Sequence, residues 1–157
     1  MKQTVLLLRH AKAGDRLKWR GDDRSRPLTK AGGKQASALI RTLAAVPVST
    51  VFSSPYRRCV ETVLPLARAR KLDVIEIAIL AEGSSPSQVF SWLSQLDAPA
   101  VLCSHGDVIE GVRELVDDEA ERSVGTAFTE KGAGWLLELE DGVVVSLRRL
   151  PPPAVKD

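Results

Sequence analysis

The sequence has little net charge, few cysteines and no long apolar run. A formal net charge of +2 over 157 residues argues against a nucleic-acid binder that depends on a large basic field. The two cysteines, Cys59 and Cys103, are expected to be reduced thiols that fill the core. The apolar stretch at residues 4–8 is too short for the core of a signal peptide or for a bilayer span. These absences predict a cytoplasmic protein without membrane or nucleic-acid partners.

What remains is an ordinary globular composition, with 44% hydrophobic and 27% charged residues. That balance excludes disorder and low complexity. A chain of this length is long enough for one domain with a substantial core and short for two. No internal repeat or linker interrupts it, so we expect a single domain over residues 1–157 that acts as a monomer.

Apolar patterning indicates strands and helices in alternation. Short apolar runs predict buried strands, and apolar residues three or four positions apart predict helices. Strands are expected at residues 5–8, 48–52, 73–80 and 100–103, and helices from Thr29, after Ser54-Pro55, from Ser85-Pro86 and around Val108. Pro55 should lie in the first turn of the second helix, and Pro65 should kink or shorten that helix.

Three further signals define the predicted architecture. Residues 11–28 have no clear period and are expected to form a long loop, which in compact domains is often functional. After Thr29, an apolar stripe that includes Leu39, Leu43 and Ala44 predicts one buried helix face. Asp141-Gly142 between residues 134–140 and 143–150 is a hairpin signal. Together they predict an α/β fold, a three-layer α/β/α sandwich with a largely parallel central sheet.

Both histidines of the chain follow predicted strands, and arginines accompany them. Because ligands in open α/β sheets bind beyond the carboxyl ends of the strands, these side chains are expected to meet at one end of the sheet. The residues concerned are Arg9 and His10 after the first strand, Arg57 and Arg58 after the second, and Ser104, His105 and Gly106 after the fourth.

Such a group suits phosphoryl chemistry. Guanidinium forks match the oxygens of a phosphoryl group, and a neutral imidazole nitrogen can attack phosphorus to give a covalent intermediate. Cationic neighbours should keep the attacking imidazole neutral near pH 7. A metal site built from His10, His105, Asp107 and Cys103 is disfavoured, because no closely spaced ligand pair exists and adjacent arginines would repel a divalent cation.

Four ordered motifs resemble the histidine phosphatase superfamily, also called the phosphoglycerate mutase-like family. Leu8-Arg9-His10-Ala11 resembles its Arg-His-Gly signature, with alanine in the position of glycine. Residues 28–36 are similar to its Leu-Thr-x-x-Gly-x-x-Gln-Ala segment, and residues 53–62 to its Ser-Ser-Pro-x-x-Arg-x-x-Gln-Thr segment. Ser104-His105-Gly106 is similar to its second histidine motif.

The resemblance implies a phosphoglycerate mutase-like fold and a set of roles. His10 would be the nucleophile, and Arg9, Arg58 and His105 would bind the phosphoryl group, with no metal or other cofactor. It selects Arg58 over Arg57 as the arginine of the pocket. Within the superfamily, the short SixA-type phosphohistidine phosphatases are the most similar, and the chain also resembles the phosphatase-like half found fused to Nudix hydrolase domains in actinobacteria. The lack of large insertions favours an open site.

Five further residues are candidates with weaker signals. Glu82 follows the third predicted strand, where many family members place a proton donor, although it could instead cap or solvate the loop. Arg16 and Arg26 lie in the long loop and could bind substrate or be surface charges. Ser104 and Gly106 flank the second histidine and are candidate substrate contacts.

Three functions stay open at this point. The leading one is a metal-independent phosphatase that forms a phosphohistidine on His10 and acts on a phosphohistidine protein or a phosphomonoester, nucleotides included. A non-catalytic phosphate-binding regulatory module would keep the same pocket without turnover. A phosphoglycerate-type mutase would share the nucleophile, but the lack of enclosing insertions disfavours it.

Overall fold

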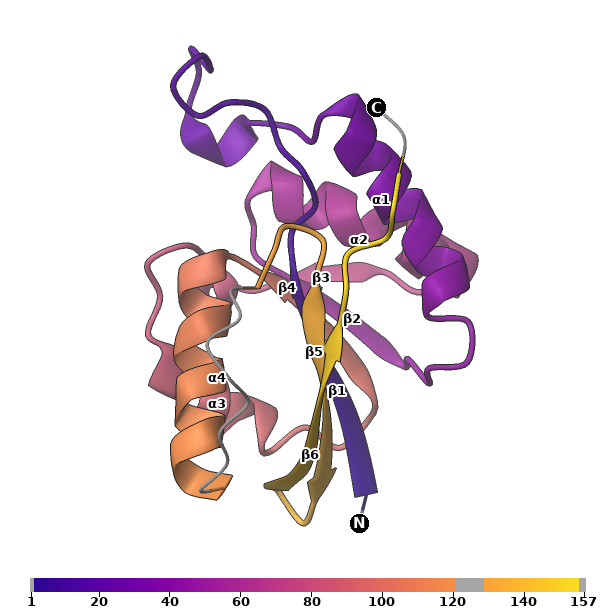
Figure 1. Cartoon of the computed structure of the whole chain (residues 1–157), viewed down its shortest axis with the longest axis vertical. Helices are drawn as coiled ribbons and strands as arrows, with labels where there is room; N and C mark the ends of the chain where they lie inside the picture. The colour runs from indigo at the N-terminus through magenta and orange to yellow at the C-terminus, as the bar shows by residue number, and fades with distance from the viewer. Residues whose placement is uncertain (1, 121–128, 156–157) are drawn as a thin grey trace.

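A six-stranded sheet organises the described residues, which in this computed structural model are 2–120 and 129–155. The order within it is β3-β2-β4-β1-β5-β6, with β1 to β4 parallel and β5 and β6 antiparallel (Figure 1). The strands are β1 (Lys2–Arg9), β2 (Thr50–Ser53), β3 (Val74–Glu76), β4 (Ala100–Ser104), β5 (Gly134–Glu140) and β6 (Val143–Leu150). The predicted largely parallel sheet is confirmed.

Helices cover both faces of this sheet. In Figure 1, α3 (Pro86–Leu93) and α4 (Gly106–Ala120) lie on one side, and α1 (Lys30–Thr42) and α2 (Arg57–Ala69) lie on the other. The described chain therefore has the three layers that the alternating pattern predicts. No helix within residues 2–120 and 129–155 is long and apolar enough to cross a bilayer.

The inner strand β1 contributes side chains to both halves of the core. Val5 and Leu7 belong to the apolar cluster of α3 and α4, whereas Leu6 and Leu8 belong to that of α1 and α2. Successive side chains of a strand point to opposite faces, so an uninterrupted apolar run is what a strand covered on both sides requires. The polar residues that follow this run emerge at the end of the sheet.

Helix α1 begins where the sequence predicts and ends slightly earlier. Its N-cap is Thr29, whose Oγ1 accepts the amide of Gly32 at 3.0 Å. Of the predicted stripe, Ala36, Leu39 and the C-cap residue Leu43 are buried, and Ile40 is half-buried. Ala44 was expected on the same stripe but is exposed, because the helix ends at Thr42 and its periodicity no longer applies.

Pro55 differs from its predicted position, and Pro65 does not shorten α2 as one of its two predicted effects required. Pro55 precedes the N-cap residue Tyr56 instead of lying in the first turn. Pro65 lies inside the helix, which continues past it, so the predicted shortening is wrong. Leu66 and Ala67, which follow the proline, are fully buried against the sheet. Their packing outweighs the backbone hydrogen bond that a proline removes.

The third predicted strand is much shorter than residues 73–80. β3 ends at Glu76, and a 3-10 turn, Ala78–Leu80, replaces the rest. β3 is an edge strand that pairs only with β2, so the residues after it have no second neighbour to extend the ladder. The turn buries Leu80 completely and brings the following segment to the carboxyl end of the sheet.

The predicted hairpin between β5 and β6 is confirmed with its turn. Asp141 and Gly142 have φ of 52° and 80°. Positive φ at both central residues is the conformation of the two-residue turn that Asp-Gly favours. The hairpin places β5 beside β1 along the whole of β5.

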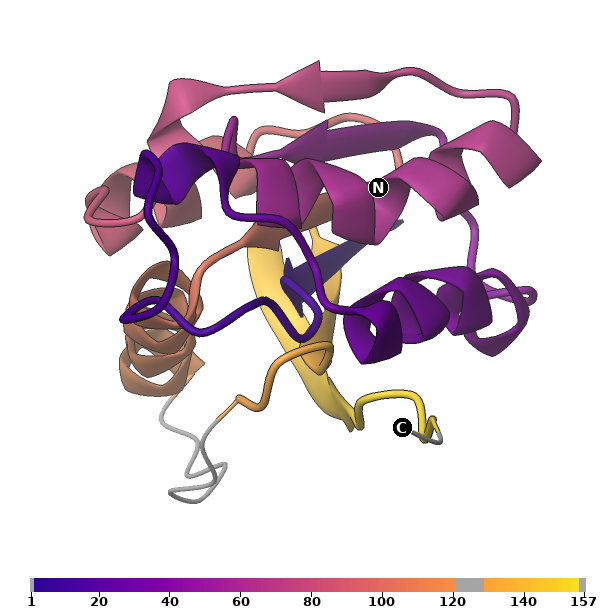
Figure 2. The ribbon, with the colours of Figure 1, turned by 90° about the horizontal axis from the view of Figure 1, so that it is seen from above.

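Residues 11–28 form the expected long loop. Its regular structure consists of a 3-10 turn, Asp23–Ser25, and one isolated bridge between Ala13 and Leu28. Seen from above in Figure 2, the loop crosses the near end of the molecule between α4 and α1. It therefore lies over the carboxyl ends of the parallel strands.

Adjacent glycines in α1 test how tightly this loop packs on the helix. A Cβ on Gly32 would lie 1.9 Å from the carbonyl oxygen of Lys12, whereas a Cβ on Gly33 would meet nothing within 4 Å. We expect Gly32→Ala to lower the free energy of unfolding by at least about 2 kcal/mol. Gly33→Ala should raise it by up to about 1 kcal/mol, because alanine favours the helix. Urea unfolding measures both, and similar effects of the two substitutions would contradict the close contact.

Candidate active site

Backbone hydrogen bonds hold the end of β1 in place. The amide of His10 donates to the carbonyl of Ser104 at the end of β4, at 3.1 Å. The amide of Arg9 donates to the carbonyl of Ala133, just before β5, at 2.9 Å. The two neighbouring strands thereby position both residues of the first motif.

Of the two ring nitrogens of His10, Nδ1 is hydrogen-bonded and Nε2 is available for reaction. Its Nδ1 lies 2.8 Å from the carbonyl oxygen of Ala11, which can only accept, so Nδ1 carries the proton. Nε2 therefore keeps its lone pair and is the atom able to act as a nucleophile. Ala11 is itself held by its amide, which donates to Thr62 Oγ1 at 2.9 Å. Its side chain is fully buried, so alanine fits where the family has glycine.

Burial keeps the His10 ring neutral. The residue is 5% exposed, and loss of hydration is the largest cause that lowers its pKa from 6.5 to about 3. The charges of His105, Arg58 and Arg9 lower this pKa further, while the bond to the Ala11 carbonyl opposes the shift. The expectation that cationic neighbours keep the ring neutral has the right sign, but desolvation contributes more.

A serine orients the second imidazole. Ser54 Oγ lies 2.8 Å from Nε2 of His105 and accepts the amide of Tyr56 at 3.2 Å. The Ser54 hydroxyl donates to Nε2 in the tautomer of His105 that carries its proton on Nδ1, and in that tautomer Nδ1 is a donor. The ring centroids of His10 and His105 are 5.6 Å apart, so the predicted meeting of the two imidazoles is confirmed.

Arg58 is fully buried although it is charged. Its Nη1 donates to the carbonyl of Asp23 at 2.9 Å, and its Nη2 lies 3.2 Å from the Asp23 carboxylate and 3.5 Å from that of Glu82. Arg57 is exposed and pairs with Glu61 one helical turn away at 3.3 Å. The prediction that Arg58, and not Arg57, enters the site is confirmed in position.

Arg9 is held against the start of α4. Its Nη1 donates to the carbonyl of Thr129 at 2.7 Å. A Cβ on Gly106 would lie 2.9 Å from Cζ of Arg9. The guanidinium can therefore pack here only because residue 106 has no side chain. Gly106 thus contributes space, and it also lines the cleft described below.

Three buried nitrogen atoms at the site have no hydrogen-bond partner in the part of the chain that the structure describes. They are Nε of Arg9, Nε of Arg58 and Nδ1 of His105. Leaving a buried donor unpaired costs about 1–3 kcal/mol, so such atoms are rare. Two are guanidinium donors, and Nδ1 of His105 is a donor in the tautomer described above; N–H groups of these kinds bind oxyanions.

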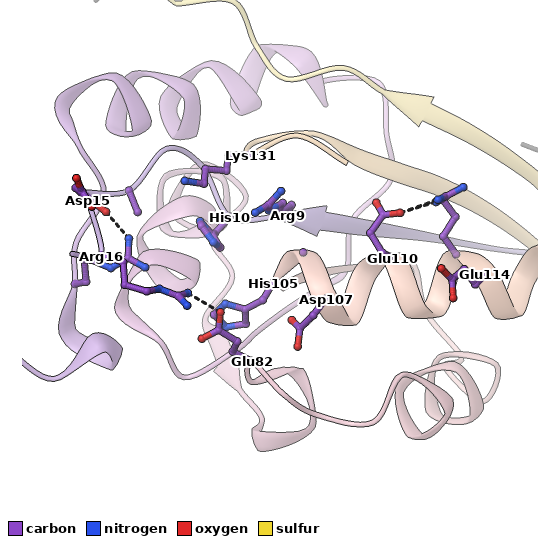
Figure 3. Close-up of a pocket in the computed structure, with 15 residues that line it drawn as sticks. Arg9, His10, Asp15, Arg16, Glu82, His105, Asp107, Glu110, Glu114 and Lys131 are labelled. Carbon is purple, nitrogen blue, oxygen red and sulfur yellow. Dashed lines mark hydrogen bonds and ion pairs between the residues drawn. The ribbon is translucent and has the colours of Figure 1, made fainter. Parts of the chain in front are cut away.

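The site opens onto a cleft of about 1040 Å³. Figure 3 shows Arg16, Glu82 and Lys131 around His10, while acidic side chains follow one side of α4. The charged residues that line the cleft are Arg9, Asp15, Arg16, Arg26, Glu82, Asp107, Glu110, Arg113, Glu114 and Lys131. The cationic end of the cleft therefore surrounds the candidate nucleophile.

Glu82 and Arg16 lie at this cationic end. An ion pair of 2.7 Å joins Arg16 Nη2 to Glu82 Oε1. Both residues line the cleft, as does Arg26. Arg26 is 4% exposed, because its guanidinium binds the Asp23 carboxylate at 2.9 Å and the carbonyl of Gly14. These contacts hold the loop in place. Because Arg26 is buried, the alternative prediction that it is a surface charge is wrong.

The structure corrects the expectation for Ser104. Its Oγ donates to the carbonyl of Leu80 at 2.6 Å, and the residue does not line the cleft. Ser104 is the last residue of β4, and its hydroxyl ties that strand to the 3-10 turn before Glu82. It supports the position of Glu82 instead of contacting a ligand.

Several contacts of the site are not predicted by the sequence. Ser54 and Thr62 stand there only as letters of a motif, and Asp23, with Asp22 and Asp107, is only a weaker candidate than Glu82 for the proton donor. Lys131 lies in a short segment between α4 and β5 that carries no sequence signal. Their roles depend on contacts between residues far apart in the chain.

The described histidine, cysteine and acidic side chains do not form a metal centre. Within residues 2–120 and 129–155, no three side chains of His, Cys, Asp or Glu are grouped so that they could hold a metal ion. Cys59 and Cys103 are fully buried in the core, as expected for apolar fillers.

Comparison with known proteins places these features in a family. A model described as the histidine phosphatase superfamily, branch 1, matches residues 5–85, just over half of the chain. The chain belongs to the histidine phosphatase superfamily. An 8-oxo-(d)GTP phosphatase of Mycolicibacterium smegmatis is 35% identical over 162 residues, which cover 98% of this chain and 50% of the relative. This chain therefore spans about half the length of that curated relative.

Solved structures share the fold of this histidine phosphatase chain. The protein histidine phosphatase SixA complexed with tungstate has a TM-score of 0.78 at 21% identity, covering 95% of this chain and 97% of that one. A phosphoglycerate mutase of Plasmodium falciparum has a TM-score of 0.63 at 19% identity, covering 100% and 99%. The expected phosphoglycerate mutase-like fold, with SixA-like structures among its neighbours, is confirmed.

The lowered pKa of His10 makes the stability of this superfamily member depend on pH. The unfolded chain binds a proton at this imidazole below about pH 6.5, whereas the folded protein does so only near pH 3. Between these values the unfolded state holds more protons, so stability falls as the pH is lowered. We expect His10 to account for a loss of about 2 kcal/mol between pH 7 and about pH 5.

Urea unfolding at the two pH values, for wild type and His10→Asn, measures this contribution. Asparagine does not titrate in this range, so the variant should lose less stability on acidification. An equal loss in both proteins would contradict the assignment to His10.

Proposed function

We propose that this chain is a metal-independent phosphatase that transfers a phosphoryl group to Nε2 of His10 and then to water. The observation that carries the proposal is the available Nε2 beside three unpartnered buried donors, which fit the oxygens of one phosphoryl group. Membership of the histidine phosphatase superfamily and the phosphatase names of relatives support it.

In the first step, Nε2 of His10 attacks phosphorus opposite the leaving oxygen. The nitrogen–phosphorus bond forms while the bond from phosphorus to the leaving oxygen breaks. Arg9, Arg58 and Nδ1–H of His105 donate to the equatorial oxygens, where charge redistributes in the transition state. The two guanidiniums supply the charge stabilisation that a metal gives to other phosphatases, so the proposed mechanism requires no metal.

In the second step, water attacks the phosphorus of the phosphohistidine. The nitrogen–phosphorus bond breaks, orthophosphate leaves, and His10 regains the neutral ring with its proton on Nδ1. Glu82 is the proposed proton donor to the leaving oxygen and the acceptor of the proton of water. Its carboxylate reaches the site, 3.5 Å from Arg58, through the turn that Ser104 holds.

The proposed substrate is a phosphorylated small molecule of nucleotide type, with a phosphohistidine protein as the alternative. The name of the 35% identical relative, an 8-oxo-(d)GTP phosphatase, supports the nucleotide. The SixA structure is only 21% identical, so its similarity supports the fold and not a particular substrate. A cleft of about 1040 Å³ has room for a nucleotide next to His10.

Hydrolysis of para-nitrophenyl phosphate in EDTA tests the nucleophile and the arginine. We expect His10→Ala to lose at least roughly a thousandfold in kcat, since no other group can form the intermediate. Arg58→Gln should lose roughly a hundredfold or more, because a buried donor to the phosphoryl group is removed. Wild type should be fully active in EDTA and should form a base-stable, acid-labile phosphoenzyme after rapid mixing.

Arg57→Gln is the matched control, since Arg57 has the same charge one position away but points to solvent. It should keep full activity. Activity that survives in His10→Ala, or that EDTA abolishes in wild type, would refute the mechanism. Tight binding of orthophosphate without turnover would indicate a phosphate-binding module.

Glu82→Gln tests the proton donor through the leaving group. A poor alkoxide leaving group needs a proton in the transition state, whereas para-nitrophenolate does not. We therefore expect kcat/KM for an alkyl phosphate to fall at least about tenfold more than that for para-nitrophenyl phosphate. Equal losses on both substrates would exclude Glu82 as the donor.

A further inference from the structure

Lys131 is fixed beside the candidate nucleophile by its neighbour in the chain. The amide of Gly132 donates to the carbonyl of His10 at 2.9 Å and to that of Arg9 at 3.3 Å. Gly132 has a φ of 86°, a left-handed conformation that glycine adopts without strain. Figure 3 shows the Lys131 side chain over His10, at the same end of the cleft as Arg16. Lys131 therefore lines the same end of the cleft as His10.

The surroundings of Lys131 are cationic. Partial burial lowers the pKa of its amine, and the charges of Arg9, Arg26 and Arg16 lower that pKa further. No hydrogen bond or ion pair joins its ammonium group to another residue in 2–120 or 129–155. Lys131 is exposed, so its ammonium group is open to solvent beside these guanidiniums, and this concentration of positive charge attracts an anion.

Four of the five carboxylates that line the cleft contact groups other than Lys131. Glu82 binds Arg16, and Asp107 accepts the amide of Gly83 at 2.8 Å. Glu110 pairs with Arg113 at 2.7 Å and also accepts the amide of Thr129. Asp15 accepts the amide of Leu17 at 2.9 Å. None of these four carboxylates forms an ion pair with Lys131.

Arg16 supplies a second cation at the same end of the cleft. It comes from the loop over the strand ends, and its side chain is 58% exposed. One of its five N–H donors is used by Glu82, and its Nε lies 3.8 Å from Asp23, beyond hydrogen-bond distance. The remaining donors can bind an anion while the ion pair with Glu82 persists.

We infer that Lys131 and Arg16 form a second anion subsite, which binds the phosphoryl group next to the one that His10 attacks. The inference rests on the proposed function and refines its substrate class. The substrate is a phosphoanhydride, such as a nucleoside diphosphate or inorganic pyrophosphate, because the second phosphoryl group is then only one bridging oxygen away from the first.

A phosphoanhydride substrate is compatible with the ion pairs that Glu82 forms with Arg16 and Arg58. Nε2 of His10 attacks the terminal phosphorus, the bond from that phosphorus to the bridging oxygen breaks, and the bridging oxygen leaves with the remaining phosphate. A phosphate leaving group needs much less protonation than an alkoxide. The ion pairs that hold Glu82 therefore do not obstruct this step. Water then releases orthophosphate from His10, as for any other substrate.

Inhibition of para-nitrophenyl phosphate hydrolysis by pyrophosphate and by orthophosphate, both in EDTA, tests the subsite. In wild type, the inhibition constant of pyrophosphate should be at least about tenfold lower than that of orthophosphate. Lys131→Gln and Arg16→Gln should each shrink this ratio at least about fivefold, while orthophosphate binding changes by less than about threefold. Lys18→Gln removes an exposed charge of the same loop outside the cleft and should leave the ratio unchanged.

A ratio near one in wild type, or an unchanged ratio in Lys131→Gln, would overturn the inference. If para-nitrophenyl phosphate is not turned over, the two affinities are measured by calorimetry, so failure of the phosphatase mechanism and failure of the subsite give different results. Release of orthophosphate from ADP and from pyrophosphate, with AMP as the single-phosphate comparison, shows which phosphoanhydride is used.

Discussion

The site depends on positive charge that the fold buries without enclosing an equal number of negative charges. Arg58 is fully buried, and donors on Arg9, Arg58 and His105 have no partner among the described residues. Each such donor costs about 1–3 kcal/mol, which the apolar packing on both faces of the sheet must offset. An oxyanion removes that cost when it binds. The destabilised empty site and the affinity for a phosphoryl group thus have the same origin.

Burial lowers the pKa of both Arg9 and His10, but it leaves the first charged and the second neutral. It lowers the pKa of Arg9, but the ordinary pKa of a guanidinium is so high that the group stays charged. The same effect lowers the pKa of His10 to about 3 and leaves the imidazole neutral. One desolvated environment therefore provides both a charged binding group and an uncharged nucleophile. Hydrogen bonding to the Ala11 carbonyl then decides which ring nitrogen is available.

Topology explains how residues so far apart in the chain come together. Parallel strands β1, β2 and β4 end at the same edge of the sheet, and each is followed by a residue of the site. The antiparallel strand β5 contributes from the opposite chain direction. The segment before it supplies the carbonyl groups of Thr129 and Ala133 to Arg9, and it places Lys131 over His10. The loop between β1 and α1 closes the other side with Asp23 and Arg16.

The sequence by itself determined the elements, because apolar period and caps act over a few residues. Thr29, the apolar run of β1 and Asp141-Gly142 sufficed for their elements, and the strand ends indicated His10, His105 and Arg58. Tertiary structure decided what depends on distant partners. It let α2 continue past Pro65, because buried neighbours compensate, and it turned the hydroxyl of Ser104 toward Leu80. It also brought Lys131 to the nucleophile, since only the folded chain brings the amide of Gly132 to the carbonyl of His10.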